Sequence, residues 1–365
     1  MVNENPYQSM GMLPIDSDMF FGRQREMRRI LDMLSGETPQ CVSIIGERRI
    51  GKSSLANRVL HQLRNTPDTQ AVYLDCDSLS ETCQSKDHFF QCLNDAFGAQ
   101  VYKEKDKKLF TDYPSFKVFI SDAANKGIKT VIFLDEFEHL PYDEKKNKNS
   151  FADDHFFSNL RSMAYDPTNR LAFVTLSKTK LKELTHRSVQ VSGFWNIFQE
   201  KPLGLLDTKS IKQLRTSGFK RTAMSLTGEK IEKIHYYAGD FPFFNQVACR
   251  FLWEAKINKD EPDWDELEVE LFPFYQGLWH DRTREEQELL KHLKSKEDIT
   301  LKEMKSRGVI IKEEESYLPF CGFFSLLIIN KNLEIKKEKF FEKESVRNFN
   351  EVIDMAGKVK DLVKR

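Results

Sequence analysis

Short apolar runs alternate with stretches of helical spacing along the first two hundred residues. Each run holds five or six mostly apolar residues, as expected for a buried strand of a parallel sheet. The predicted strands cover residues 41–45, 71–75, 130–135 and 171–176, and the run 202–206 is expected to close the sheet. The predicted helices between them cover residues 53–60, 88–97, 115–126 and 153–165. Regular alternation of strands and helices predicts an α/β fold with a parallel sheet.

The pattern changes after residue 206, where strand signals stop and helical spacing takes over. Asp207 is a suitable N-cap for a helix over 210–215, and a second helix over 230–237 follows Gly228 and ends at Gly239. A third helix over 241–255 has Pro242 in its first turn. These helices predict a small helical lid.

A different order of elements follows. Residues 283–286 read Thr-Arg-Glu-Glu, a capping box that opens a helix over 286–293. A second helix over 300–307 stops at Gly308, and the apolar segments 309–312 and 316–320 flank three glutamates as in a hairpin. Two helices followed by a hairpin are the outline of a winged helix-turn-helix.

These patterns divide the chain into five parts. They are a lead-in over 1–38, a nucleotide-binding domain over 39–206, the helical lid over 207–265, a winged-helix-like domain over 266–330 and a charged helical tail over 331–365. Residues 143–150 are polar and predict a mobile loop.

Composition adds little to this picture except by exclusion. The 365 residues hold 56 basic and 56 acidic side chains, so no global field draws the protein to nucleic acid or to a membrane. The six cysteines are scattered and lack metal-ligand pairing, which favours reduced thiols in the cytoplasm. Neither a signal peptide nor a membrane-spanning stretch is recognisable, so no membrane partner is expected.

The most informative motif follows the first predicted strand. Gly46, Gly51, Lys52 and Ser53 fit the phosphate-loop pattern G-x-x-x-x-G-K-[ST], between a strand and a helix as that motif requires. The helix N-terminus attracts phosphate oxygens, Lys52 would reach the β- and γ-phosphates, and the Ser53 hydroxyl would bind Mg²⁺. A glycine-rich turn that matches by chance is the alternative. A second motif downstream makes ATP and Mg²⁺ the expected cofactors.

That second motif is a pair of acids at the end of the strand over 130–135. Asp135 would hold the Mg²⁺ shell, and Glu136 would polarise the attacking water as general base. The alternative is a strand that ends in a solvated acidic turn. Glu138 and His139 lie beyond the pair and are expected at the surface.

Taken together, several segments resemble the STAND branch of the AAA+ ATPases, which are signal-transducing switches of prokaryotic conflict systems. Residues 21–23 match the hydrophobic-Gly-Arg motif, 46–53 the phosphate loop, 134–136 the acidic motif, and 238–246 the Gly–Pro motif of the lid. The resemblance covers residues 5–330. Asp240 and Phe241 replace the Gly-His that commonly precedes the proline, which leaves the nucleotide contacts of that turn open.

The resemblance implies an α/β fold with a parallel P-loop sheet of the AAA+ type, a helical lid and a C-terminal winged-helix-like domain. It also implies a set of nucleotide-binding residues around the phosphate loop. They are Phe21, Gly22, Arg23, Gly46, Glu47, Arg48, Arg49, Ile50, Gly51, Lys52, Ser53, Ser54, Gly239 and Pro242.

Two further positions follow from what AAA+ proteins place near the γ-phosphate. Ser177 is the candidate for the polar sensor at the end of the strand over 171–176, although Thr175 and Ser177 both suit ordinary strand hydroxyls. Arg161 and Arg170 are candidates for an arginine supplied to a neighbouring subunit. Surface ion pairing is the alternative for each arginine. A guanine-reading motif is not supported, because residues 258–261 fall one residue short of N-K-x-D.

The expected function is a Mg²⁺–ATP switch that hydrolyses ATP slowly and acts with separate effector or sensor proteins in a prokaryotic defence or signalling system. A homo-oligomer or a complex with such a protein is expected, because the arginine acts across an interface. The alternative is an AAA+ regulator that binds DNA through Lys302, Lys305 and Arg307. The nearby acids dilute that charge, so packing is favoured over DNA contact. A third reading is a scaffold that holds nucleotide without hydrolysis.

Overall fold

The computed structural model describes residues 4–7, 11–104, 106–140, 151–184, 187–220, 225–293, 298–314 and 316–330. The chain forms two compact units. The α/β unit holds Arg23–Gly46 and Lys52–Pro202, and the helical unit holds Met1–Gly22, Glu47–Gly51 and the chain from Leu203 onward. The middle of the phosphate loop thus belongs to the helical unit, whereas both of its flanks belong to the α/β unit.

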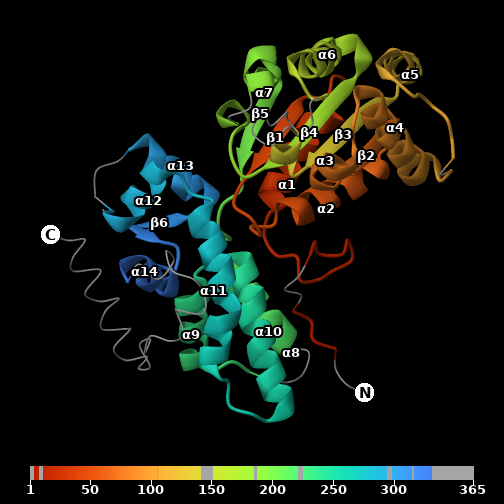
Figure 1. The fold of residues 1–365 in the computed structure, drawn as a ribbon. Helices are drawn as coiled ribbons and strands as arrows, with labels where there is room; N and C mark the ends of the chain where they lie inside the picture. The colour runs from red at the N-terminus through yellow and green to blue at the C-terminus, as the bar shows by residue number, and fades with distance from the viewer. Residues whose placement is uncertain are drawn as a thin grey trace. The chain divides into compact units, whose positions relative to one another are not determined.

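A five-stranded sheet forms the centre of the α/β unit (Figure 1). Its strands are β1 (Cys41–Ile45), β2 (Thr69–Asp75), β3 (Lys129–Asp135), β4 (Leu171–Ser177) and β5 (Phe198–Pro202). They pair in parallel in the order β2-β3-β4-β1-β5. Because β4 lies between β1 and β3, the carboxyl ends of these three strands meet at one edge of the sheet.

Helices flank this sheet, as expected for parallel strands joined by crossover helices. They are α1 (Gln24–Ser35), α2 (Lys52–Arg64), α3 (Cys76–Thr82), α4 (Lys86–Phe97), α5 (Tyr113–Asn125), α6 (Asp154–Tyr165) and α7 (Arg187–Ser192). Figure 1 shows α1 and α2 on one side of the sheet and α6 and α7 on the other. The helices predicted from spacing in this region are confirmed.

The closing strand was predicted four residues too late. β5 is Phe198–Pro202 and pairs in parallel with β1. Gln199 and Glu200 in its middle are exposed, which fits the edge of a sheet. Because these residues are polar, the segment lacks the apolar run that predicts a buried strand. The apolar residues that follow, Leu203 and Leu206, are instead buried in the helical unit.

The helical unit begins with the lid helices α8 (Thr208–Lys220), α9 (Gly228–Ala238) and α10 (Pro242–Asn258). Then follow α11 (Trp264–His280), α12 (Arg284–Lys291), α13 (Ile299–Arg307), the antiparallel strands β6 (Ile310–Glu313) and β7 (Ser316–Pro319), and α14 (Gly322–Ile329). The caps at Asp207 and Thr283, the stop at Gly308 and the hairpin are confirmed. The sequence did not predict α11, which has Pro273 in its interior, or the mostly apolar α14.

Aromatic rings fill the core of the helical unit. Phe244 of α10 stacks on Tyr275 of α11 with ring centroids 4.3 Å apart, and Phe320 lies 5.5 Å from Phe244. The lead-in joins this unit through Tyr7, whose hydroxyl donates a hydrogen bond of 2.8 Å to the Arg215 carbonyl of α8. Gly218 makes room for that ring, because a Cβ there would lie 2.5 Å from it.

Two other expectations concern the chain as a whole. All six cysteines are free thiols, as predicted. Within the part of the chain that the structure describes, no helix combines the length and the apolar character that a membrane span needs. The predicted loop over 143–150 and the predicted tail over 331–365 lie outside the described residues.

Candidate functional site

The turn from β1 into α2 builds the base of the phosphate loop. The Lys52 ammonium donates a hydrogen bond of 3.0 Å to the Gly46 carbonyl, and its residue is 8% exposed. The Gly46 amide donates to the Ser177 carbonyl at 3.1 Å, which ties the loop to β4. Gly51 has a φ of 102°, and no atom lies within 4 Å of a Cβ placed there. The loop therefore presents an open backbone and a cation at a helix N-terminus, which is the requirement for a phosphate group.

Asp135 lies against this helix N-terminus. The Ser53 hydroxyl donates a hydrogen bond of 2.7 Å to Asp135 Oδ2, and the Glu136 amide donates to Oδ1 at 2.9 Å. The Tyr73 hydroxyl also donates to Asp135 Oδ2. Burial raises the pKa of Tyr73, and the Asp135 charge raises it further, so Tyr73 remains a donor. These contacts hold a carboxylate and a hydroxyl side by side, and oxygen ligands of this kind suit Mg²⁺.

Glu136 leaves the strand in an unusual backbone conformation. Its φ of 50° and ψ of 42° are left-handed, which is uncommon for a residue with a side chain. The turn ends the strand and leads into the short 3-10 helix η2 (Phe137–His139). The Glu136 side chain is 40% exposed, so water can reach its carboxylate. A general base needs this access.

The end of β4 carries the two hydroxyls considered as sensors. Ser177 is fully buried, and its hydroxyl donates a hydrogen bond of 2.7 Å to the Thr179 carbonyl. The Thr175 hydroxyl is also buried but has no hydrogen-bond partner. Ser177 is the sensor predicted from the sequence, although residues two apart share one face of a strand and both hydroxyls suit that position. The Thr175 hydroxyl, unlike that of Ser177, can still form a hydrogen bond.

The middle of the loop, Glu47–Gly51, is enclosed by charges of the helical unit. The Glu47 carboxylate is fully buried and accepts two hydrogen bonds from Arg282, one of them 2.8 Å from Nη1 to Oε1. Arg307 Nη1 lies 3.6 Å from Glu47 Oε1, and Arg307 also donates to Glu286. Burial by itself lowers the pKa of Arg282, but Glu47 and Glu286 raise it, so the guanidinium stays charged. We call these four side chains the loop-apex network.

The remaining side chains of the loop also contact the helical unit. Arg48 Nε lies 3.5 Å from Asp281 Oδ2. The Arg49 guanidinium lies 4.5 Å from the centre of the Phe243 ring and 4.6 Å from that of Phe274. Ile50 is fully buried. Among the predicted nucleotide-binding residues 47–50, Glu47 and Ile50 are buried, whereas Arg48 and Arg49 are exposed.

The other predicted nucleotide contacts have local structural roles as well. Gly22 has a φ of 69°, and a Cβ there would lie 2.9 Å from Ser210 Oγ. Arg23 is 7% exposed, and its guanidinium lies 3.6 Å from Glu26. Phe21 is half-buried, as is Ser54, which follows Ser53 in the first turn of α2. None of these contacts tests a nucleotide role.

The Gly–Pro turn of the lid is tightly packed. Gly239 has a φ of 48°, and a Cβ there would lie 2.0 Å from the Phe320 carbonyl oxygen, so only glycine fits. Its own carbonyl accepts hydrogen bonds from Arg215 at 2.6 Å and from Asn245 at 2.9 Å. Pro242 is the first residue of α10, where its missing amide costs nothing.

The two candidate trans-acting arginines bind main-chain carbonyls within the α/β unit. Arg161 Nη1 donates to the Ser192 carbonyl at 3.3 Å, and Arg170 Nη1 donates to the Gly127 carbonyl at 3.1 Å. Both side chains are half-buried. Their role at a subunit interface stays a prediction.

One expectation about the acidic motif is wrong. Glu138 and His139 were expected at the surface, but both are half-buried, and both carboxylate oxygens of Glu138 are shielded from solvent. The 3-10 turn after Glu136 folds them back against the unit. Reasoning from the sequence also missed Tyr73, Arg282 and Arg307, because their partners are distant along the chain.

Comparison with known proteins gives the family. Residues 20–243 match the model of an ATPase domain found predominantly in Archaea, which is more than half of the chain. None of the curated proteins matches the sequence significantly.

Solved structures with the same fold are distant in sequence. A Walker-type ATPase of Pyrococcus abyssi is 14% identical with a TM-score of 0.60, over 88% of this chain and 99% of that one. The Aeropyrum pernix ORC2 protein is 12% identical with a TM-score of 0.48, over 99% of each chain. At such identity the likeness concerns the fold. The predicted fold class is confirmed, with a parallel sheet of the AAA+ type, a helical region and a small hairpin.

Proposed function

We propose that this chain, which belongs to the family of ATPase domains found predominantly in Archaea, binds Mg²⁺–ATP and hydrolyses it as a molecular switch. The family implies ATP and Mg²⁺ as ligands in general. The observation that carries the proposal is the hydrogen bond of 2.7 Å between Ser53 and Asp135, beside Lys52 at the N-terminus of α2.

In this proposal each residue has one task. Lys52 holds the β- and γ-phosphates, and Ser53 with Asp135 holds Mg²⁺, which neutralises charge on those phosphates. Glu136 accepts a proton from the attacking water. Thr175 or Ser177, at the end of the strand between β1 and β3, would sense the γ-phosphate.

The loop-apex network supports a switch rather than a simple hydrolase. The loop residues 47–51 cluster with the helical unit, while Gly46 and Lys52 on either side cluster with the α/β unit. Contacts to the γ-phosphate exist only in the triphosphate state. The conformation of the loop backbone should therefore differ between the states with and without this phosphate. A change in the loop therefore reaches the helical unit through Glu47, which that unit holds directly.

The finer role proposed is that of a STAND-type switch that signals to separate effector or sensor proteins in prokaryotic defence, with an arginine of a neighbouring subunit completing the site. The alternative, a DNA-binding regulator, is weakened by Arg307. Its guanidinium is engaged with Glu286 and Glu47, which removes one of the three basic side chains proposed to contact DNA. A gel shift without binding at low salt would eliminate that alternative.

The direct test is ATP binding and turnover by the purified full chain. Lys52→Ala should abolish ATP binding in equilibrium titration, because it removes the cation at the base of the phosphate loop. Lys117→Ala, an exposed change on α5 of the same unit, is the control and should bind ATP like the wild type. Unchanged affinity in Lys52→Ala would place the nucleotide elsewhere.

A further inference from the structure

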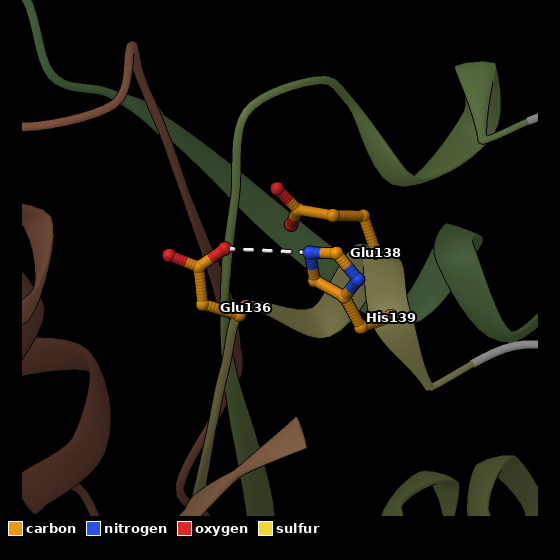
Figure 2. A group of neighbouring side chains, drawn as sticks. All are labelled: Glu136, Glu138 and His139. Atoms are coloured by element: carbon orange, nitrogen blue, oxygen red, sulfur yellow. Dashed lines mark ion pairs between the residues drawn. The ribbon is translucent and has the colours of Figure 1, made fainter. Parts of the chain in front are cut away.

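Three side chains with metal-binding atoms converge just beyond β3. They are Glu136, Glu138 and His139, and one ligand atom of each lies within 4.8 Å of those of the other two. Figure 2 shows the two carboxylates and one edge of the imidazole ring turned toward the same space. Glu136 Oε2 and His139 Nε2 are 3.6 Å apart.

Glu138 is the residue of this cluster whose carboxylate is stabilised by no hydrogen bond. Both of its carboxylate oxygens are shielded from solvent, and neither has a hydrogen-bond partner. A buried carboxylate without a partner is costly, because it has lost its water shell and gained nothing in exchange. A cation at the point where Glu136, Glu138 and His139 meet would supply the missing interaction.

His139 is oriented from its other side. Its Nδ1 lies 3.4 Å from Oδ1 of Asp77, which belongs to α3. When one nitrogen of a neutral imidazole donates its N–H hydrogen bond to a carboxylate, the other nitrogen carries the lone pair that can bind a metal. Metal-binding histidines are commonly held in this way, and here the remaining nitrogen is the one that faces Glu136.

The surroundings add negative charge. Burial raises the pKa of the Cys76 thiol well above its usual value, and the carboxylates of Asp135, Asp75, Glu138 and Glu136 raise it further. The field there favours a cation.

We propose that Glu136, Glu138 and His139 form a binding site for a divalent transition-metal ion of the zinc class, with Asp77 orienting the histidine. One imidazole nitrogen and two carboxylate oxygens suit zinc, cobalt or manganese better than magnesium or calcium, which prefer oxygen alone. Three protein ligands leave a fourth position for water.

The distances fit this geometry. Zinc bonds of about 2.1 Å in a tetrahedron place ligand atoms roughly 3.4 Å apart. The 3.6 Å between Glu136 and His139 is already close to that value, and a ligand atom of Glu138 lies within 4.8 Å of theirs. The proposed site is separate from the magnesium site, which uses the Ser53 hydroxyl and the Asp135 carboxylate.

Occupancy has a consequence for turnover, which rests on the proposed function. A metal ion on Glu136 takes the lone pairs that the general base needs, so the ion inhibits hydrolysis without displacing Mg²⁺–ATP. Binding of a transition-metal ion at this site would thus regulate ATP hydrolysis.

The test measures Co²⁺ binding to the nucleotide-free full chain by visible absorption. Calorimetry measures Zn²⁺ binding to the same chain. The wild type should bind one ion with the intense absorption of tetrahedral Co²⁺. Glu138→Gln and His139→Ala should each weaken binding at least tenfold, whereas Asp77→Asn should weaken it less. Ser53→Ala, at the magnesium site, and the exposed Glu183→Gln are the controls and should bind Co²⁺ like the wild type.

Circular dichroism confirms that each variant is folded. Absence of Co²⁺ and Zn²⁺ binding in the wild type would overturn the site. Undiminished binding in Glu138→Gln and His139→Ala, or loss of binding in Ser53→Ala, would also overturn it.

A second readout separates the site from the proposed function. With Mg²⁺ in large excess, Zn²⁺ should inhibit ATP turnover of the wild type and inhibit Glu138→Gln at least tenfold less effectively. Metal binding without inhibition would keep the site but overturn the role of Glu136 as base. A wild type that hydrolyses ATP but binds neither Co²⁺ nor Zn²⁺ would overturn the site and keep the proposed function.

Discussion

The loop-apex network and the cluster beyond β3 are two groups of charged side chains with opposite character. In the network, two glutamates face two arginines, the side chains are at most 11% exposed, and Glu47 accepts two hydrogen bonds from Arg282. In the cluster, two glutamates share one histidine, and Glu138 has no hydrogen-bond partner at all. The first group is closed and balanced. The second is open and short of positive charge.

The difference indicates what each group is for. A closed network satisfies its own members and cannot take a ligand without breaking, so it suits a fixed attachment of the loop to the helical unit. An open cluster keeps unsatisfied ligand atoms at a cost, which natural structures accept mainly at functional sites. Neutralising a glutamate should therefore have opposite effects in the two groups.

Glu47→Gln should give the largest loss of stability. It leaves the buried guanidinium groups of Arg282 and Arg307 with one carboxylate between them, which costs about 3–5 kcal/mol in comparable buried pairs. Chemical denaturation measures this as a lower midpoint. The double change Glu47→Gln with Arg282→Gln should lose less than the sum of the single changes, since it keeps the balanced pair Glu286–Arg307. Strict additivity would show that the network is not a unit.

Glu268 provides a buried carboxylate that belongs to neither group. It lies on α11 and accepts a hydrogen bond of 2.9 Å from the Tyr237 hydroxyl, and burial raises its pKa from 4.5 to about 7. The unfolded chain therefore releases this proton at a lower pH than the folded protein does. Stability contributed by the protonated form is complete below pH 4.5 and is lost as the pH rises through 7.

Glu268→Gln should remove that loss, which amounts to roughly 3 kcal/mol. The variant should be more stable than the wild type at pH 8 and about equal at pH 4, as measured by urea denaturation at both values. Glu266→Gln, an exposed change on the same helix, is the control and should show no such difference. Equal behaviour of the two variants would mean that Glu268 titrates normally.

Glu138→Gln should give the smallest effect, with the opposite sign to Glu47→Gln. Removing an uncompensated charge should raise the stability of the metal-free protein by about 1 kcal/mol. Denaturation in the presence of a chelator measures it, and Glu183→Gln serves as the exposed control. A destabilised Glu138→Gln protein would mean that Glu138 has a favourable partner and that the cluster is not open.

Sequence patterns predict most accurately the features that depend on residues close together in the chain. The strand before Gly46, the acids after Leu134, and the caps at Asp207 and Thr283 depend on neighbouring residues, and the structure has them where the pattern predicts. It failed where the partner is distant or the pattern is atypical. β5 is polar because it is an edge strand, and α11 contains a proline.

The candidate site shows the same limit. The motifs identify Lys52, Ser53, Asp135 and Glu136. No pattern near Glu47 in the sequence predicts its partner Arg282, which is 235 residues away. Thr175 and Ser177 share one face of β4, and only their hydrogen bonds distinguish them.

The central claim is that the edge of the sheet holds a hydrolytic site with Glu136 as its base. The most direct measurement is ATP affinity and single-turnover hydrolysis of Glu136→Gln beside the wild type. Asp135 keeps its contacts with Ser53 in this variant, so ATP and Mg²⁺ should bind as in the wild type. Hydrolysis should fall by about a hundredfold or more, since general-base catalysis contributes that much. Hydrolysis at the wild-type rate would contradict the account.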